Sequence, residues 1–356
     1  MPRAPNQRVL IWSLKAQPGG GGLCGLELAR ALNAQPGVTA SVCCLADSAM
    51  ERLAQSMHLT VHGLPPAFLQ SRRAFAVLLD ELRPTLVVNP MLSLRQTPLL
   101  PLVLRSTARY ALMIHESRGR PGNSTLAERV GFVAQRWEGA HADLCVALSE
   151  HTAAQVAKDV SPSCLLTRVH PAFTAAVEKS PAAALATPPR ILFFGRSNAS
   201  KGLDRLLAAF AHLRKQIAVE LDLCVSEATA RDLGQREGVH CQTDFLSEQA
   251  LEARIQAADV VALPYENATQ SGVAARAMGV GCPCVATPVG GLPEQVLHER
   301  TGRVARDMTP EAFANALRSV LTDTTGYPAL VQENLALAAG ERSWRAFARA
   351  LLEALP

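Results

Sequence analysis

The fold is decided by residues 265–294, which read YENATQSGVAARAMGVGCPCVATPVGGLPE. This stretch follows a short apolar strand at 259–264, and it predicts a polar loop, a helix of small residues, a second buried strand at 283–287 and a Gly-Gly turn. Ser271 and Gly272 stand where the loop becomes helix. A helix start of this kind binds anions, because the N–H groups of its first turn and the positive end of the helix dipole point at the ligand. The alternative is an ordinary helix with Ser271 as its N-cap.

A second strand–loop–helix unit lies upstream of this stretch. The apolar strand 191–195 leads into a loop that carries Arg196 and Lys201, and a periodic helix is predicted at 203–217. A guanidinium offers a planar fork to phosphate oxygens, and an ammonium offers a compact charge. Because the carboxyl ends of parallel strands meet at one edge of a sheet, two such helix starts predict a diphosphate held between them. The alternative is a solvated basic loop.

Both stretches resemble signatures of the family-4 retaining glycosyltransferases, which have the GT-B fold. Residues 195–202, GRSNASKG, are similar to the family motif G-R-x4-K-G. Residues 268–294 are similar to its second signature, A-M-x-x-G-x-P-V-V-A-T-x-x-G-G-x-x-E. The resemblance implies a nucleoside-diphosphate sugar as the donor and neither a metal nor another cofactor. The donor-binding residues that it implies in this half of the chain are Gly195, Arg196, Lys201, Gln270, Ser271, Gly272, Val273 and Arg276.

One departure from the family pattern concerns the ribose. Members often carry two glutamates eight positions apart, of which the second holds the ribose hydroxyls, and the matching positions here are Ala268 and Arg276. Some members with a similar T-Q-S-G-V loop also lack this pair. The base and the ribose contacts are therefore left open, and Arg276 offers a cation to a phosphate or to another acidic group.

A length of 356 residues suits two domains better than one ordinary core. We expect a Rossmann-like domain at 1–180 and another at 181–340, each an α/β doubly wound parallel sheet. The Pro- and Ala-rich segment 180–190 is the predicted linker. The resemblance implies that the two domains face each other across a cleft, the first binding the acceptor and the second the donor. It also implies that a final helix at about 341–356 returns to the first domain.

Apolar runs alternate with helical patterns along the first half of the chain, which predicts a parallel sheet covered on both faces. The predicted strands are 8–14, 38–45, 85–89, 109–115 and 142–148. The predicted helices are 23–32, 68–82 and 127–140. In such a sheet, functional side chains belong at the carboxyl ends of the strands.

A glycine-rich segment at 15–25, KAQPGGGGLCG, follows the first strand. Its Gly-x-Gly-x-x-Gly spacing, with Asp47 after the next strand, matches a dinucleotide-binding fingerprint and so an NAD(P)-dependent oxidoreductase. However, five residues separate the strand from the first glycine, whereas the dinucleotide turn follows its strand directly. The segment is also similar to the first loop of the transferases, where the backbone of Gly20, Gly21 and Gly22 would approach the donor phosphate. A plain flexible loop is the third interpretation.

The strand within 111–117, ALMIHES, ends in His115 and Glu116. The family often ends this strand in a similar pair, and its histidine is thought to contact the transferred sugar or the donor phosphate. The resemblance therefore implies that His115 acts in catalysis together with Arg196 and Lys201. Asn89, which ends the preceding strand, and Glu116 are expected on the acceptor side.

The charge is uneven along the chain. Residues 1–180 hold 18 Lys and Arg against 12 Asp and Glu, a net +6, whereas residues 181–356 hold 17 against 19, a net −2. By resemblance, this suits a lipid-linked or membrane-surface acceptor at the first domain and an enzyme at the inner face of a membrane. A scatter of solvated arginines is the alternative, and no pattern indicates nucleic-acid binding.

The first residues carry no basic-then-apolar leader, and no apolar run reaches the roughly 20 residues of a membrane span, so we expect a cytoplasmic protein. The nine cysteines include no C-x-x-C pair, and we expect reduced core residues and no metal site. The resemblance implies a metal-independent, retaining hexosyltransferase in polysaccharide biosynthesis. Two other classes stay open: a non-catalytic scaffold with the same fold, and the oxidoreductase.

Overall fold

The strands pair into two separate parallel sheets, each within its own unit of the chain. The computed structural model describes residues 7–116, 126–195, 199–244 and 246–356. The first unit comprises Met1–Val169 and Trp344–Pro356, and the second comprises His170–Ser343. All strand pairings within the two sheets are parallel, as the sequence predicts.

The first unit contains a sheet of seven strands in the order β3-β2-β1-β4-β5-β6-β7. The strands are β1 (Gln7–Trp12), β2 (Val38–Leu45), β3 (Thr60–Leu64), β4 (Leu86–Asn89), β5 (Arg109–Ile114), β6 (Leu144–Ala147) and β7 (Leu165–Thr167). The helices are α1 (Gly19–Asn33), α2 (Ala49–Ser56), α3 (Phe68–Leu82), η1 (Thr97–Leu99), α4 (Leu100–Arg105), α5 (Leu126–Ala140), α6 (Glu150–Asp159) and α14 (Trp344–Glu353).

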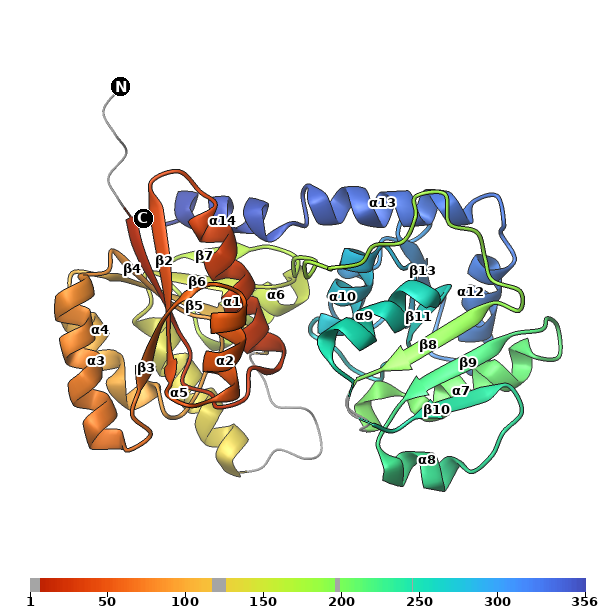
Figure 1. Cartoon of the computed structure of the whole chain (residues 1–356), viewed down its shortest axis with the longest axis horizontal. Helices are drawn as coiled ribbons and strands as arrows, with labels where there is room; N and C mark the ends of the chain where they lie inside the picture. The colour runs from red at the N-terminus through yellow and green to blue at the C-terminus, as the bar shows by residue number, and fades with distance from the viewer. Residues whose placement is uncertain (1–6, 117–125, 196–198, 245) are drawn as a thin grey trace. The chain divides into compact units, whose positions relative to one another are not determined.

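Helices cover both faces of this sheet. Figure 1 shows α1 and α2 on one side and α3 and α4 on the other. Phe75 of α3 stacks on Trp12 of β1, with 4.8 Å between ring centroids, inside a core of buried aliphatic side chains. The central strands β4 and β6 are fully buried because helices cover both faces of the sheet, whereas the edge strand β3 is partly exposed.

The helix α14 belongs to the first unit although it ends the sequence. It packs on α1, and its buried residues include Trp344, Phe347 and Leu351. The chain therefore leaves the first unit after Val169 and re-enters it at Trp344.

The second unit contains a sheet of six strands in the order β10-β9-β8-β11-β12-β13. The strands are β8 (Arg190–Phe194), β9 (Glu220–Cys224), β10 (Val239–Gln242), β11 (Val260–Leu263), β12 (Cys284–Ala286) and β13 (Gly302–Val304). The helices are η2 (Ala199–Lys201), α7 (Leu203–Leu213), α8 (Glu227–Leu233), α9 (Glu248–Ala257), α10 (Gly272–Val280), α11 (Leu292–Gln295), α12 (Pro310–Leu321) and α13 (Tyr327–Ala339). Side chains of α7, α12 and α13 fill one core, and those of α9, α10 and α11 fill the other.

The glycine-rich segment of the first unit differs from the prediction. A loop was expected up to Gly22, but α1 begins at Gly19, so Gly20, Gly21 and Gly22 form its first turn. Gly22 N donates to the carbonyl of Pro18 at 2.8 Å, which closes that turn. Glycine is a poor helix former, so its low propensity conceals the helix start in the sequence.

Candidate functional site

Two helix starts come together at the carboxyl ends of β8 and β11, which are neighbours in the second sheet. Gly195 follows β8 with a φ of +122°, and Val273 Cγ2 lies 3.5 Å from the place where a Cβ would stand on Gly195. The loop after β8 is therefore in contact with the first turn of α10. Arg196, the next residue of the motif, lies outside the residues that the structure describes.

Lys201 and Ser271 are linked by one buried ring. The Nζ of Lys201 lies 3.6 Å from the centroid of the Tyr265 ring, an arrangement in which a cation is attracted to the face of the aromatic system. The hydroxyl of Tyr265 lies 3.3 Å from Ser271 Oγ. Burial raises the pKa of Tyr265, so the phenol keeps its proton at neutral pH. We call Lys201, Tyr265 and Ser271 the strand-end cluster.

Ser271 is the N-cap of α10, which is the alternative that the sequence left open. Its Oγ accepts a hydrogen bond from Ala274 N at 3.3 Å. Gln295, the last residue of α11, makes two hydrogen bonds to the backbone of Ser271. Its Oε1 accepts from Ser271 N at 2.6 Å, and its Nε2 donates to Ser271 O at 3.1 Å. Gln270, Gly272 and Val273 beside this cap are half-buried. The sequence does not predict this contact, because Gln295 lies 24 residues away from Ser271.

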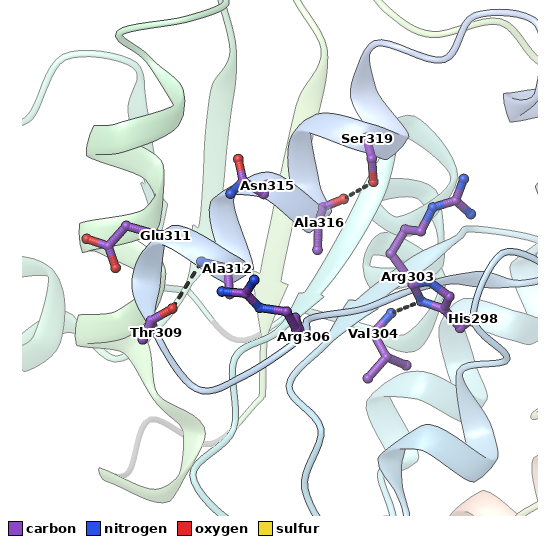
Figure 2. A pocket seen from close by; sticks show the side chains of 10 residues that line it. All are labelled: His298, Arg303, Val304, Arg306, Thr309, Glu311, Ala312, Asn315, Ala316 and Ser319. Atoms are coloured by element: carbon purple, nitrogen blue, oxygen red, sulfur yellow. Dashed lines mark hydrogen bonds between the residues drawn. The ribbon is translucent and has the colours of Figure 1, made fainter.

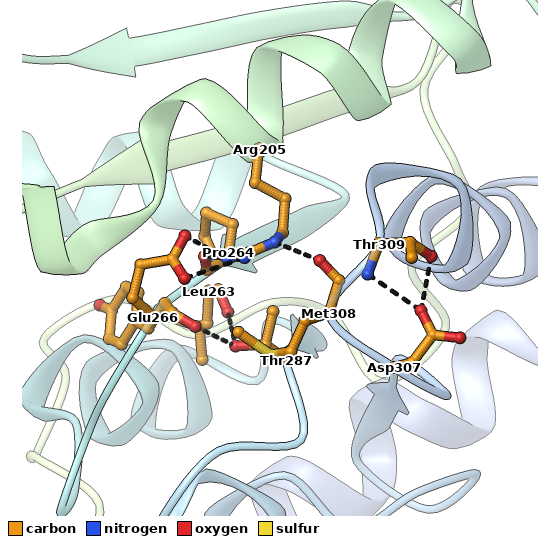
Figure 3. Close-up of polar contacts among 9 residues, drawn as sticks. Arg205, Leu263, Pro264, Glu266, Thr287, Asp307, Met308 and Thr309 are labelled. Atoms are coloured by element: carbon orange, nitrogen blue, oxygen red, sulfur yellow. Dashed lines mark hydrogen bonds and ion pairs between the residues drawn. The ribbon is translucent and has the colours of Figure 1, made fainter.

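Arg205 of α7 joins the loops that follow β11 and β13 (Figure 3). Its Nη1 donates to Pro264 O at 2.8 Å and its Nε donates to Met308 O at 2.7 Å. The guanidinium also pairs with both carboxylate oxygens of Glu266, at 2.8 and 2.9 Å. Gly202 fits against the same carbonyl of Pro264, since a Cβ on it would lie 1.8 Å from that oxygen. These contacts hold Lys201 at a fixed place relative to α10.

In the first unit, α1 begins against the turn that follows β4. A Cβ on Gly21 would lie 1.8 Å from Met91 Cε, and one on Gly25 would lie 2.7 Å from Pro90 Cγ. Gly19 and Gly20 have no heavy atom within 4 Å of that position among the described residues. The Gly-x-Gly-x-x-Gly spacing thus serves helix packing in part, and it lies inside α1 and not in a strand-to-helix turn. The oxidoreductase interpretation loses its geometric basis.

His115 lies at the same turn. Its Nε2 is 2.8 Å from Pro90 O, which can only accept, so Nε2 carries the proton of the neutral ring. Burial lowers the pKa of His115, opposed by the bond to Pro90 and by Glu116, so the ring is neutral at pH 7. Glu116 is half-buried, and its carbonyl accepts from Gln135 Nε2 at 2.9 Å. The structure thus brings His115 and the start of α1 together at one edge of the first sheet.

Asn89 does not lie on an acceptor-facing surface, which corrects its predicted position. The residue is fully buried, and its Nδ2 donates to Tyr110 Oη at 3.1 Å and to Glu138 Oε2 at 3.0 Å. Glu138 also accepts from Tyr110 Oη at 2.7 Å and from Thr97 Oγ1 at 2.6 Å. Asn89 therefore belongs to a buried polar network that fixes α5 and the turn after β4.

We expect Glu138→Ala to lower the free energy of unfolding by about 3 kcal/mol, because the three donors that face the carboxylate would be left buried and unsatisfied. Glu138→Gln should cost less, since its amide can accept from Tyr110 and Asn89 while Thr97 turns its hydroxyl to accept. Urea denaturation of the two variants measures this difference. Equal losses of stability in the two variants would contradict the role of Glu138 as the acceptor of these hydrogen bonds.

The same carboxyl predicts a pH dependence. Burial raises the pKa of Glu138 from its ordinary value of 4.5, and the hydrogen bonds oppose that rise only in part. Since the folded pKa exceeds the unfolded one, the stabilisation is complete below the unfolded pKa and is lost as the pH rises through the folded value. The stability advantage of the wild type over Glu138→Gln should therefore shrink as the pH rises above about 4.5. A stability difference between the two proteins that does not change with pH would contradict the predicted direction.

The family model of the glycosyl transferases group 1 matches residues 188–323, which include both helix starts of the second unit. The second unit thus resembles a group 1 glycosyltransferase domain, and we call it the glycosyltransferase domain. D-Inositol 3-phosphate glycosyltransferase from Xylanimonas cellulosilytica is 33% identical to this chain over 174 residues, which cover 46% of this chain and 41% of that protein. The same-named protein from Corynebacterium aurimucosum is 34% identical over 146 residues, 37% of this chain and 35% of that protein. The chain thus matches less than half the length of these relatives.

The whole chain has the GT-B fold. The Anabaena protein HepE, solved in complex with UDP, aligns over 98% of this chain and 99% of its own with a TM-score of 0.73 and 18% identity. Sucrose-phosphate synthase from Thermosynechococcus elongatus aligns over 98% of each chain with a TM-score of 0.74 and 18% identity. At this identity the likeness establishes the fold alone. None of the helices in the described part of the chain has the length and apolar character to cross a bilayer.

Arg276 of the glycosyltransferase domain has protein partners of its own. Its Nη1 pairs with Glu248 of α9, and its guanidinium lies 5.3 Å from the Phe173 ring. These contacts fix α10 against α9 and against the segment that enters the domain. The predicted contact with the donor therefore stays a prediction, and any such role would be shared with Glu248.

A pocket of about 360 Å³ lies elsewhere in the glycosyltransferase domain, on α12 and β13 (Figure 2). It is lined by His298, Arg303, Val304, Arg306, Thr309, Glu311, Ala312, Asn315, Ala316 and Ser319. No residue of the strand-end cluster lines it. Glu311 of this lining lies 3.1 Å from His212, and Arg306 lies 3.3 Å from Asp307.

Proposed function

We propose that the protein is a retaining hexosyltransferase that moves a sugar from a nucleoside-diphosphate sugar to a hydroxyl of a glycan or lipid-linked glycan. The observation that carries the proposal is the strand-end cluster, in which Lys201 and the cap of α10 share the Tyr265 ring at the edge where two helix starts meet. An ammonium and helix N–H groups that converge at one place suit a diphosphate. The match of this domain to the group 1 family supports the same chemistry.

Each predicted residue then has a role at the reacting bond. Lys201 and Arg196 would neutralise the charge that develops on the leaving diphosphate, with the N–H groups of Gly272 and Val273 assisting. The bond between the anomeric carbon and the phosphate oxygen breaks, and the acceptor oxygen bonds to the same face of that carbon. The leaving phosphate takes the acceptor's proton, and neither a metal nor an enzyme nucleophile is assigned a step.

The first unit would supply the acceptor side of the site. His115, whose Nε2 donates to Pro90 and whose ring is neutral at pH 7, would accept a hydrogen bond from the transferred sugar at its other ring nitrogen. The backbone at Gly20, Gly21 and Gly22 would approach the donor phosphate, and Glu116 would contact the acceptor. The proposal also places the enzyme in the cytoplasm, at the inner membrane face, and assigns it to polysaccharide biosynthesis.

UDP is the first nucleotide to test, because HepE was solved with UDP and with UDP-glucose. Calorimetric titration with UDP, GDP, ADP and NAD should detect binding of one nucleoside diphosphate. Lys201→Ala should weaken the affinity for that nucleotide at least about tenfold through loss of one charged contact. Lys215→Ala, which removes an exposed lysine of the same unit, is the matched control. Binding of NAD alone would overturn the proposal.

A non-catalytic scaffold with the same fold is the second candidate. The observation in its favour is the ion pair of Arg276 with Glu248. Arg276 stands at the position where the family often carries the glutamate that holds the ribose, so a cation replaces a carboxylate there. A protein that binds a nucleoside diphosphate but releases no sugar from UDP-glucose, UDP-galactose or GDP-mannose, with lipid-linked and soluble acceptors, would favour the scaffold.

A further inference from the structure

Among the residues that the structure describes, the exposed large hydrophobic side chains are confined to one of the two units. All nine large hydrophobic residues that are exposed in the described part of the chain belong to the first unit: Phe68, Leu69, Val77, Leu94, Leu104, Leu126, Val130, Val133 and Trp137. Single exposed hydrophobic residues need no explanation, but a contiguous set marks an interaction surface. Four of the nine lie on α5.

The four residues of α5 form one stripe. Leu126, Val130, Val133 and Trp137 are 77%, 48%, 66% and 38% exposed and stand at intervals of four, three and four residues. This spacing places them on a single face of the helix, over a length of about 17 Å. We call these four residues the α5 stripe.

The stripe cannot turn into the core of its own unit. The opposite face of α5 carries Glu138, which is held by Asn89, Tyr110 and Thr97, and Gln135, which donates to Glu116 O. Both side chains are buried. The polar anchors therefore fix the rotation of α5 and keep its apolar face outward.

The charge around the stripe selects the kind of partner. Arg129 and Arg136 are exposed and stand seven residues apart, so both flank the stripe on one side of the helix. The first unit holds 19 Lys and Arg against 12 Asp and Glu, a net +7, whereas the second holds 16 against 19, a net −3. An apolar helix face with tryptophan at one end and arginines at its edge suits the interface of an anionic bilayer.

We propose that the α5 stripe is a membrane-docking surface, which lies in the plane of a bilayer that contains anionic lipid. Leu126, Val130, Val133 and Trp137 enter the boundary between headgroups and acyl chains, and Arg129 and Arg136 contact lipid phosphates. The α5 stripe belongs to the first unit and the strand-end cluster to the second, and they share no residue. The inference therefore deepens the membrane-face part of the proposed function and does not rest on the proposed transfer reaction.

The test is co-sedimentation of the full chain, without nucleotide, with vesicles of phosphatidylcholine alone or mixed with phosphatidylglycerol. The wild type should bind the anionic vesicles, and high salt should weaken that binding. Val130→Ser/Val133→Ser should lower the partition coefficient about tenfold or more, through loss of apolar contact. Arg129→Gln/Arg136→Gln should remove the preference for anionic vesicles. Val77→Ser, an exposed valine on α3, is the matched control and should bind like the wild type.

Trp137 supplies a second readout. The protein has three tryptophans, and Trp12 and Trp344 are buried whereas Trp137 is exposed. Anionic vesicles should therefore shift the emission of the wild type to shorter wavelength, and Trp137→Phe should lose the shift while it still sediments.

Three results would overturn the inference: no sedimentation of the wild type, unchanged sedimentation of Val130→Ser/Val133→Ser, or a dimer in analytical ultracentrifugation that this double variant dissociates. The last would assign the stripe to a second copy of the chain. Titration with UDP in parallel separates this surface from the donor site, because vesicle binding should persist in Lys201→Ala.

Discussion

Lys201→Ala should lower kcat/KM for sugar transfer about a hundredfold or more, with most of the loss in kcat. The reason is that charge on the leaving diphosphate develops in the transition state, where a positioned cation contributes more than it does in the bound substrate. The position of Lys201 is set by the Tyr265 ring at 3.6 Å and by the neighbouring Gly202. Steady-state kinetics with the donor identified by calorimetry measure the effect.

Two further variants separate charge from structure. Lys201→Arg keeps the charge but replaces a compact ammonium with a fork, so it should recover part of the activity. Lys215→Ala should transfer sugar like the wild type. Unaltered turnover in the double variant Arg196→Ala/Lys201→Ala would eliminate the proposed role of both cations, whatever the nucleotide affinity.

Gly202→Ala should lower the free energy of unfolding of the second unit by about 3 to 5 kcal/mol. Two effects combine there: a φ of +65°, which disfavours any side chain, and a methyl group 1.8 Å from the Pro264 oxygen. The carbonyl cannot simply move away, because Arg205 donates to it. Urea denaturation followed by circular dichroism measures the loss.

Gly281→Ala provides the control for the backbone term. Gly281, the C-cap of α10, also has a left-handed backbone, with a φ of +83° and a ψ of +13°. A Cβ there would meet only the end of the half-buried Leu335 side chain, at 2.8 Å, and that side chain can turn away. This variant should therefore cost only about 1 to 2 kcal/mol. If both variants lost the same stability, the contact with Pro264 would have no energetic weight.

The elements of this fold are encoded by local patterns, which is why most of them could be predicted. The predicted helix 68–82 and strand 38–45 coincide with α3 and β2, because each has a clear period and ends at a loop. Thr309 followed by proline marks the start of α12, and Ser271 caps α10, both through short-range hydrogen bonds. Side chains that interact within a few residues leave a readable signal.

The surroundings of the site depend on contacts between distant residues, which a single sequence does not reveal. The glycines at the start of α1 are determined in part by Met91 and Pro90, some 70 residues away. Asn89 ends a strand, as predicted, but the buried Glu138 turns it into a structural residue. Gln295 and Glu248 are likewise defined by partners on other elements.

The return of α14 has a consequence for synthesis on the ribosome. Residues 170–343 are contiguous, so the second unit can complete its sheet as soon as they have left the exit tunnel. The first unit is translated earlier, but the face of α1 that receives Trp344 and Phe347 stays uncovered until the last helix emerges. Order of translation and order of completion are therefore reversed, and the half that is made first spends longest with an unfinished surface.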